Sequence, residues 1–136
     1  MAKKFRMISS NNIPARQAII YLVDHDEHAL ASLASLLAPL NATIKSFTSA
    51  ESFLKHKVSE RSACLLLEAH LQDVSGSGIA LLEKLVRQGH TIPTIVMTSI
   101  SDIPTAVRAI QASAVDFIEK PYVEHQLLMK VKTILQ

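Results

Sequence analysis

Four polar residues each follow a short apolar run of the sequence, and their side chains are suited to binding a phosphoryl group and a metal ion. They are Asp24, Glu68, Thr98 and Lys120. Carboxylates offer the oxygen ligands that Mg²⁺ prefers, and a hydroxyl and an ammonium group can bind and neutralise phosphoryl oxygens. Because the four residues lie far apart along the chain, this chemistry requires a fold that brings them together.

The apolar runs before these residues are typical of strands that are buried on both faces of a sheet. Amphipathic helical patterns separate the runs, which indicates crossover connections and therefore a parallel sheet. In such sheets ligands bind beyond the carboxyl ends of the strands, where the strand order reverses. Strands are predicted at residues 18–23, 42–47, 63–68, 94–98 and 115–119. Helices are predicted at 27–40, after Thr48 or Ser49, from Ile79 to Gly89, after Ser101 or Asp102, and at 124–135.

The predicted helices have apolar residues at helical spacing. In the helix after Asp102, one face contains Ile103, Val107 and Ile110. The last helix is expected to bury Leu127, Leu128, Val131 and Ile134. The histidines His70, His90 and His125 are scattered, and we expect them to face solvent.

Length and composition indicate one globular domain. The 136 residues suit one hydrophobic core, and 49% of them are apolar while 19% are charged. The single cysteine, Cys64, cannot form an internal disulfide, which fits a reducing compartment. No stretch approaches the roughly 20 apolar residues of a membrane span. We expect a cytoplasmic protein with no membrane segment.

The basic charge is concentrated in the first 17 residues. This segment has a formal charge of +4 with no acidic residue, and the remainder of the chain has −2. It shows no sustained hydrophobic period, so we predict a flexible basic N-terminal tail at residues 1–17 and one folded domain at residues 18–136. Such a tail is more often a solvated segment than an arm that binds nucleic acid.

The order of the polar residues resembles that of the receiver domain of bacterial two-component response regulators. The resemblance depends on Val23-Asp24, a carboxylate at position 68, Thr98 and Lys120-Pro121. The stretch from Ile92-Pro93 to Lys120-Pro121 is especially similar to the FixJ-like subgroup. The resemblance covers residues 18–135 and implies a flavodoxin-like (βα)5 fold. This is an α/β fold with a doubly wound, five-stranded parallel sheet in the order 2-1-3-4-5, in a domain that signals and is not an enzyme.

In receivers, an aspartate at the end of the third strand accepts a phosphoryl group from a histidine kinase. Two adjacent acids after the first strand hold Mg²⁺, a threonine or serine binds a phosphoryl oxygen, and a lysine pairs with its charge. The resemblance assigns the last two roles to Thr98 and Lys120. It places Phe117 at an aromatic position that can report switching.

The chain departs from this pattern at the acceptor and at the metal-binding acids. Glu68 occupies the acceptor position, and Asp24-His25 stands in place of the acid pair, followed by Asp26. Neutral imidazole suits softer metals than Mg²⁺. We therefore expect Mg²⁺ binding to be weak or absent, with Asp24 a poor candidate ligand, and no cofactor. Asp24 is expected either to order its loop or to pair with Lys120.

The extra methylene of glutamate extends the side chain by about 1.5 Å towards the place of a phosphoryl group. We therefore predict that Glu68 lies within ion-pair reach of Lys120, with Thr98 close by. We expect Glu68 to be partly sheltered while still touching water, so that its coupling to Lys120 in such a half-exposed pair is modest, about 1 kcal/mol or a little more. The hypothesis is a pseudo-receiver, which signals without ordinary aspartyl phosphorylation.

The resemblance also implies the partners of the domain. We expect a homodimer through the surface of residues 103–112, the fifth strand and residues 124–136, with the charges of Arg108 and Lys130 at the interface. A sensor kinase or another regulatory protein would act upstream. DNA would be bound only through an output domain beyond Gln136.

Two alternatives remain at the level of sequence. In the first, the domain is a working phosphorylation switch that uses Glu68 or a nearby acid such as Asp73. In the second, it is a small α/β nucleotide-binding domain or enzyme. The loop Asp24-His25-Asp26-Glu27 argues against the second alternative, because it is acidic and lacks the glycines of a phosphate-binding loop.

Overall fold

The computed structural model describes residues 18–58, 62–71, 77–100 and 102–136. Five parallel strands form one sheet in the order β2-β1-β3-β4-β5, as predicted. The strands are β1 (Ile19–Val23), β2 (Thr43–Phe47), β3 (Ala63–Glu68), β4 (Thr94–Thr98) and β5 (Asp116–Glu119). The helices are α2 (Glu27–Leu37), a 3-10 turn (Ala38–Leu40), α3 (Ala50–Leu54), α4 (Gly78–Arg87), α5 (Ile103–Gln111) and α6 (Glu124–Leu135).

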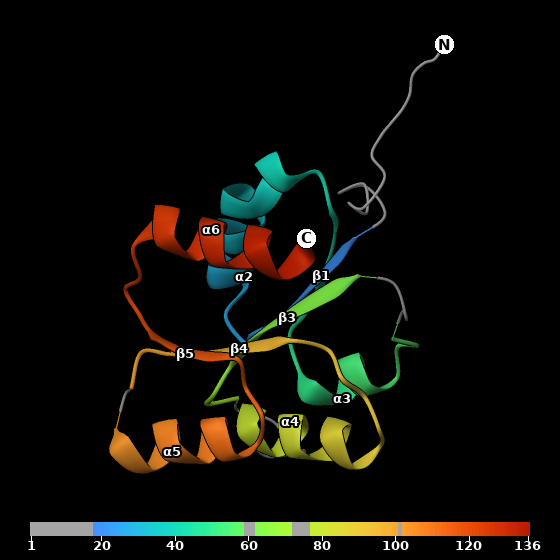
Figure 1. Cartoon of the computed structure of the whole chain (residues 1–136), viewed down its shortest axis with the longest axis vertical. Helices are drawn as coiled ribbons and strands as arrows, with labels where there is room; N and C mark the ends of the chain where they lie inside the picture. The colour runs from blue at the N-terminus through green and yellow to red at the C-terminus, as the bar shows by residue number, and fades with distance from the viewer. Residues whose placement is uncertain (1–17, 59–61, 72–76, 101) are drawn as a thin grey trace.

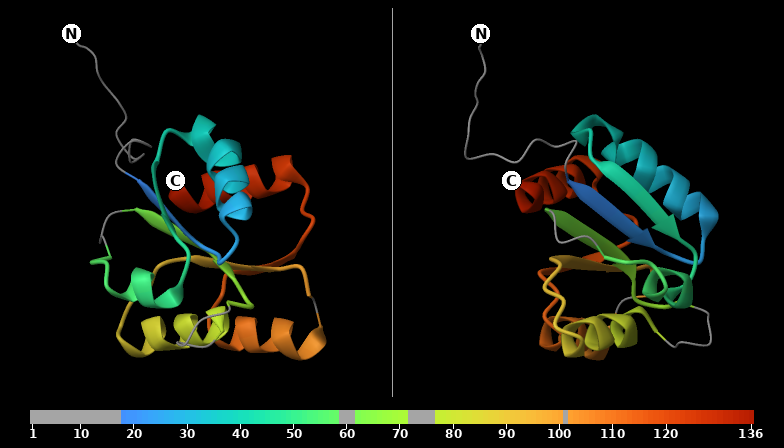
Figure 2. Two further views of the ribbon diagram at one scale, coloured as in Figure 1. Left: turned by 180° about the vertical axis from the view of Figure 1, so that it is seen from behind. Right: turned by 90° about the vertical axis from the view of Figure 1, so that its right-hand side faces the viewer.

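Helices cover both faces of the sheet. Helices α2 and α6 lie on one face, and α3, α4 and α5 lie on the other (Figure 1 and Figure 2). Successive residues of β1 alternate between the two layers: Ile20 packs with α2 and α6, while Ile19 and Tyr21 pack with the opposite layer. This alternation explains why the whole of β1 is apolar.

Short polar side chains cap several helices close to the ends of the strands. Ser49 rather than Thr48 is the N-cap of α3, and Asp102 is the N-cap of α5. Each accepts a hydrogen bond from a main-chain N–H in the first turn of its helix. Gly89 has φ +86 after α4, as expected for a left-handed helix stop. The two N-caps fix the residues at which α3 and α5 begin, and Gly89 marks the end of α4.

Helix α5 turns its large apolar residues away from the sheet. Its buried residue is Ala109, and Ala112, the residue after its last turn, is also buried. Ile103, Val107 and Ile110 are instead 80%, 48% and 55% exposed. Small residues on the inner face let the helix pack closely against the sheet at β5. The apolar stripe in the sequence is therefore a surface feature.

Helix α6 packs through a slightly different face than predicted. Leu127 and Val131 are buried as expected, but Leu135 is buried in place of Leu128 and Ile134, which are only partly covered. Spacing of four residues from 127 to 131 to 135 keeps these side chains on one face. The predicted N-terminal tail at residues 1–17 lies outside the described residues. None of the described helices combines the length and the apolar character needed to cross a bilayer.

Candidate functional site

The parallel register brings the predicted residues to one edge of the sheet. Glu68 is the last residue of β3 and Thr98 is the last residue of β4. Asp24 directly follows β1, and Lys120 directly follows β5. Val23 pairs with Leu67 and Thr98 pairs with Glu119, so all four strands end at the same level. The residues therefore meet at the carboxyl edge, where parallel sheets bind ligands.

Lys120 bridges the two carboxylates of the site. Its Nζ lies 2.8 Å from Glu68 Oε1 and 2.8 Å from Asp24 Oδ2. The contact expected between Glu68 and Lys120 is thus present. Asp24 has both of the roles predicted for it. It pairs with Lys120, and it orders its own loop by accepting a hydrogen bond from the main-chain N–H of Asp26.

The ion pair is more deeply buried than the sequence suggested. The side chains of Glu68 and Asp24 are 6% and 4% exposed, and that of Lys120 is 21% exposed. The expectation of a half-exposed pair is therefore wrong, since both carboxylates are almost fully buried. The estimate of about 1 kcal/mol for a surface pair does not apply, since removing one partner of a buried pair leaves an uncompensated charge.

Each oxygen of the two carboxylates accepts a hydrogen bond. Asp24 Oδ1 accepts from the N–H of Asp26 at 2.9 Å, and Glu68 Oε2 accepts from the N–H of His70 at 3.0 Å. Lys120 provides a donor for each of the other two oxygens. The carboxylates are therefore held by two loops and one ammonium group.

Lys120 keeps its charge in this site. Burial by itself would lower the pKa of Lys120, but the hydrogen bonds and negative charges of Asp24 and Glu68 outweigh it. The pKa of Lys120 therefore lies above its ordinary value of 10.5. At neutral pH the group is an ammonium ion.

The residues beside Asp24 lie at the rim of the site. His25 Nδ1 is 3.6 Å from Asp24 Oδ1, and its side chain is 42% exposed. Asp26 is the N-cap of α2, where its carboxylate accepts hydrogen bonds from the N–H groups of His28 and Ala29. These bonds lower the pKa of Asp26. Asp26 therefore has a structural role at the start of α2.

Thr98 lies beside Lys120, whereas Phe117 packs against the core, and the ion pair of Lys120 with the two carboxylates involves neither side chain. The buried Thr98 hydroxyl donates to the carbonyl of Ile100 and accepts from its N–H, both at 3.1 Å. The Thr98 carbonyl accepts from the N–H of Lys120 at 2.8 Å, which places the two residues side by side. Phe117 is partly buried and packs against the core under α4 and α5. The Thr98 hydroxyl thus organises the loop between β4 and α5.

His70 is a site residue that the sequence analysis missed. It was expected to face solvent, but its side chain is partly covered and its Nε2 lies 3.2 Å from the carbonyl oxygen of Ile100. Its position two residues after Glu68 places it in a loop at the functional edge, which is the signal that could have found it. His125 is exposed as expected, and His90 is partly covered.

Gly78 allows α4 to begin directly against the end of β3. Its N–H donates to the carbonyl of Ala69 at 2.9 Å. A Cβ atom at this position would lie 1.9 Å from the carbonyl oxygen of Glu68. Only glycine fits here without moving the backbone that positions Glu68.

Gly78→Ala is expected to lower the free energy of unfolding by about 2–3 kcal/mol, because the backbone of β3 or α4 must shift. Urea unfolding followed by circular dichroism measures this loss. Gly89→Ala is the control, since it strains a left-handed residue at a cost of about 1 kcal/mol but meets no neighbouring atom. Equal losses in the two variants would show that the close approach at Gly78 is not a constraint.

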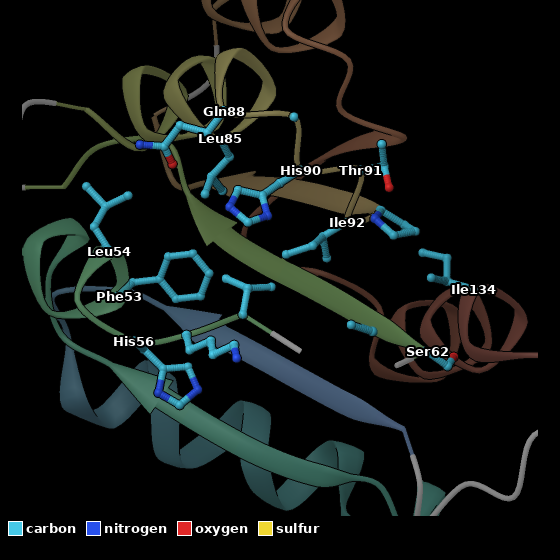
Figure 3. Close-up of a pocket in the computed structure, with 15 residues that line it drawn as sticks. Phe53, Leu54, His56, Ser62, Leu85, Gln88, His90, Thr91, Ile92 and Ile134 are labelled. Atoms are coloured by element: carbon cyan, nitrogen blue, oxygen red, sulfur yellow. The ribbon is translucent and has the colours of Figure 1, made fainter. Parts of the chain in front are cut away.

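A separate cavity of about 1220 Å³ lies at the opposite end of the strands. Its lining includes Phe53, His56, Leu85, His90 and Ile92 (Figure 3). None of the predicted site residues lines it. Within the described ranges, no cluster of three or more histidine, cysteine, aspartate or glutamate side chains is arranged to hold a metal ion.

Comparison with known proteins agrees with this arrangement. The family model for the "Response regulator receiver domain" matches residues 20–132. Over 121 residues the chain is 36% identical to the response regulator protein TmoT of Ectopseudomonas mendocina, covering 89% of this chain and 54% of TmoT. Over 103 residues it is 39% identical to the transcriptional regulatory protein FixJ of Rhizobium meliloti, covering 76% of this chain and 50% of FixJ. The chain spans about half the length of these curated relatives.

Solved structures give the same result. A response regulator receiver protein from Pseudoalteromonas atlantica is 57% identical, with a TM-score of 0.80 and coverage of 85% of this chain and 95% of that chain. The response regulator StyR is 33% identical, with a TM-score of 0.79 and coverage of 88% of this chain and 60% of that chain. The sequence relatives and the solved structures therefore agree with the family that the strand order and the order of the site residues indicate.

Proposed function

Since the chain belongs to the response regulator receiver domain family, we propose that it is a pseudo-receiver that signals without ordinary aspartyl phosphorylation. The observation that supports this proposal is the bridge from Lys120 Nζ to both Glu68 and Asp24 at 2.8 Å. In receivers the corresponding lysine pairs with the charge of the phosphoryl group. Here the longer carboxylate side chain already engages it, so the Glu68–Lys120 pair imitates part of the phosphorylated state.

The same contacts disfavour phosphorylation of Glu68. A nucleophilic oxygen must approach the phosphorus atom, yet both Glu68 oxygens are buried and hold hydrogen bonds from Lys120 and His70. Attack would require breaking one of these bonds at a carboxylate that is only 6% exposed. The alternative of a small α/β nucleotide-binding domain or enzyme has no support from the comparisons, because the family model that matches is that of a receiver domain.

The donors at this edge fit Mg²⁺ poorly. Mg²⁺ requires near-octahedral oxygen ligands, and the residue beside Asp24 is His25, a nitrogen donor. The Lys120 ammonium lies between the two carboxylates and already supplies a positive charge. We therefore expect at most weak Mg²⁺ binding and no other cofactor.

The test is exposure to a small phosphodonor. We expect that acetyl phosphate or beryllofluoride with Mg²⁺ leaves the intact mass and the NMR spectrum of the wild-type chain unchanged. The matched control is Glu68→Asp combined with His25→Asp, which restores the acceptor and the second metal carboxylate and should gain one phosphoryl group in the presence of Mg²⁺. A stoichiometric mass gain in the wild type would overturn the proposal, and peptide mapping would then distinguish Glu68 from Asp73.

For the output, we propose self-association through the α5–β5–α6 surface, which comprises α5, β5, α6 and the loops that join them. Large exposed apolar side chains gather there: Ile103, Val107, Ile110, Val115, Val123 and Met129. The two charges first considered for the interface pair within the chain instead. Arg108 lies 2.8 Å from Glu83, and Lys130 lies 2.6 Å from Asp116. The apolar side chains are therefore the sharper probes of this surface.

The wider role is proposed from the relatives. FixJ is named a transcriptional regulatory protein, and this chain aligns with only half of its length. We propose that the receiver controls transcription in the cytoplasm through a DNA-binding output domain, and that a sensor kinase or another regulatory protein acts on it.

A further inference from the structure

His70 lies between the buried ion pair and the loop that starts α5. Its main-chain N–H donates to Glu68 Oε2 at 3.0 Å, so the loop after β3 is folded onto the Glu68 carboxylate. Its ring Nε2 lies 3.2 Å from the carbonyl oxygen of Ile100. One residue therefore contacts Glu68 through its backbone and the β4–α5 loop through its side chain.

The direction of the second bond follows from the acceptor. A carbonyl oxygen only accepts, so the His70 ring must donate through Nε2–H. This hydrogen is present both in the imidazolium ion and in one neutral tautomer. The bridge therefore does not depend on protonation of His70.

The Ile100 carbonyl is a junction of two donors. It accepts from the Thr98 hydroxyl at 3.1 Å and from the His70 ring at 3.2 Å, which together use its two lone pairs. Ile100 is largely exposed, and α5 begins three residues later with the exposed Ile103. The carbonyl is therefore close in sequence to the start of the α5–β5–α6 surface.

We propose that His70 is a positioning residue that links the Glu68–Lys120 ion pair to the start of α5 by holding the Ile100 carbonyl. A change at Glu68 moves the loop around His70, and the His70 ring passes this change to Ile100. The inference rests on the proposed function, because it assumes that the state of Glu68 affects the α5–β5–α6 surface.

The experiment measures the response of α5 to Glu68→Gln in two backgrounds. Backbone amide chemical shifts of residues 103–111 are compared with and without Glu68→Gln, in the full wild-type chain and in His70→Ala. We expect the mean shift change in α5 to fall at least threefold in the His70→Ala background. This non-additivity is the sign of coupling between neighbouring sites.

Further variants separate the donor function from packing. His70→Phe keeps an aromatic ring but lacks the Nε2–H donor, so its α5 response should match that of His70→Ala. It replaces His70→Ala in the experiment if His70→Ala folds poorly. His70→Gln restores an N–H donor at a similar reach and should recover the α5 response. His28→Ala is the matched control, since His28 is exposed on α2 and only its main-chain N–H donates to Asp26.

The outcomes distinguish this inference from the proposed function. If Glu68→Gln shifts α5 equally in all backgrounds, the role of His70 is overturned while the proposed function stands. If Glu68→Gln shifts nothing in α5 even in the wild type, both the coupling through His70 and the signalling role of Glu68 are overturned.

Discussion

Replacing Lys120 by methionine is expected to lower the free energy of unfolding by about 3–5 kcal/mol. Methionine preserves much of the length of the side chain but removes the charge that Asp24 and Glu68 share. Two buried carboxylates then lack their common partner, and each loses a donor at 2.8 Å. Because small domains are stabilised by only about 5–15 kcal/mol, the loss is a large part of the total. Urea unfolding at neutral pH measures it.

Lys130→Met is the matched control for this prediction. Lys130 also pairs with an aspartate, Asp116, but its side chain is 46% exposed, so its loss should cost less than about 1 kcal/mol. Neutralising the partners with Asp24→Asn and Glu68→Gln should recover most of the stability lost in Lys120→Met. The account of the site fails if Lys120→Met costs no more than Lys130→Met.

The pH dependence provides an independent check of the same prediction. The pKa of Lys120 is raised in the folded protein, because hydrogen bonds to Asp24 and Glu68 outweigh its burial. Its contribution is therefore complete below the ordinary value of 10.5 and is lost as the pH rises through the higher folded value. The stability difference between the wild type and Lys120→Met should be constant near neutral pH and shrink above pH 10.5.

Val107→Lys is expected to weaken self-association at least tenfold, which corresponds to about 1.4 kcal/mol or more. Val107 is half-exposed near the middle of α5, between Ile103 and Ile110 on the same face. A lysine there would place an unpaired charge in the contact, and burying such a charge is costly. Sedimentation over a range of concentrations measures the dissociation constant, and circular dichroism verifies that the variant folds.

The control adds the same charge elsewhere. Ala31 is exposed on α2, away from the α5–β5–α6 surface, so Ala31→Lys should leave the dissociation constant unchanged. Two results would contradict the assignment of this surface. One is a wild-type chain that stays monomeric at high concentration, and the other is an equal effect of Ala31→Lys and Val107→Lys.

The arrangement of the sheet and the meeting of the site residues could be predicted from the sequence. Short apolar runs separated by amphipathic helices require a parallel sheet, and the carboxyl ends of parallel strands share one edge. Glu68, Thr98 and Lys120 end or follow such runs, so their proximity is a consequence of connectivity alone. Two helix starts were also predictable to within one residue, because a cap is a local interaction: the structure selects Ser49 over Thr48, and Asp102 from the pair Ser101 or Asp102.

Tertiary packing decided the features that depend on contacts between distant segments. The sequence did not reveal that Glu68 and Asp24 are buried, because burial at a strand end depends on segments that are distant in the sequence. It did not reveal that His70 contacts Ile100, since the two residues are 30 positions apart. Nor did it show which face of α5 packs on the sheet: the close approach of the helix selects Ala109 and Ala112 for the inner face and leaves Ile103, Val107 and Ile110 outside. A hydrophobic period locates an apolar stripe, but only the space available beside the sheet determines whether that stripe becomes core or surface.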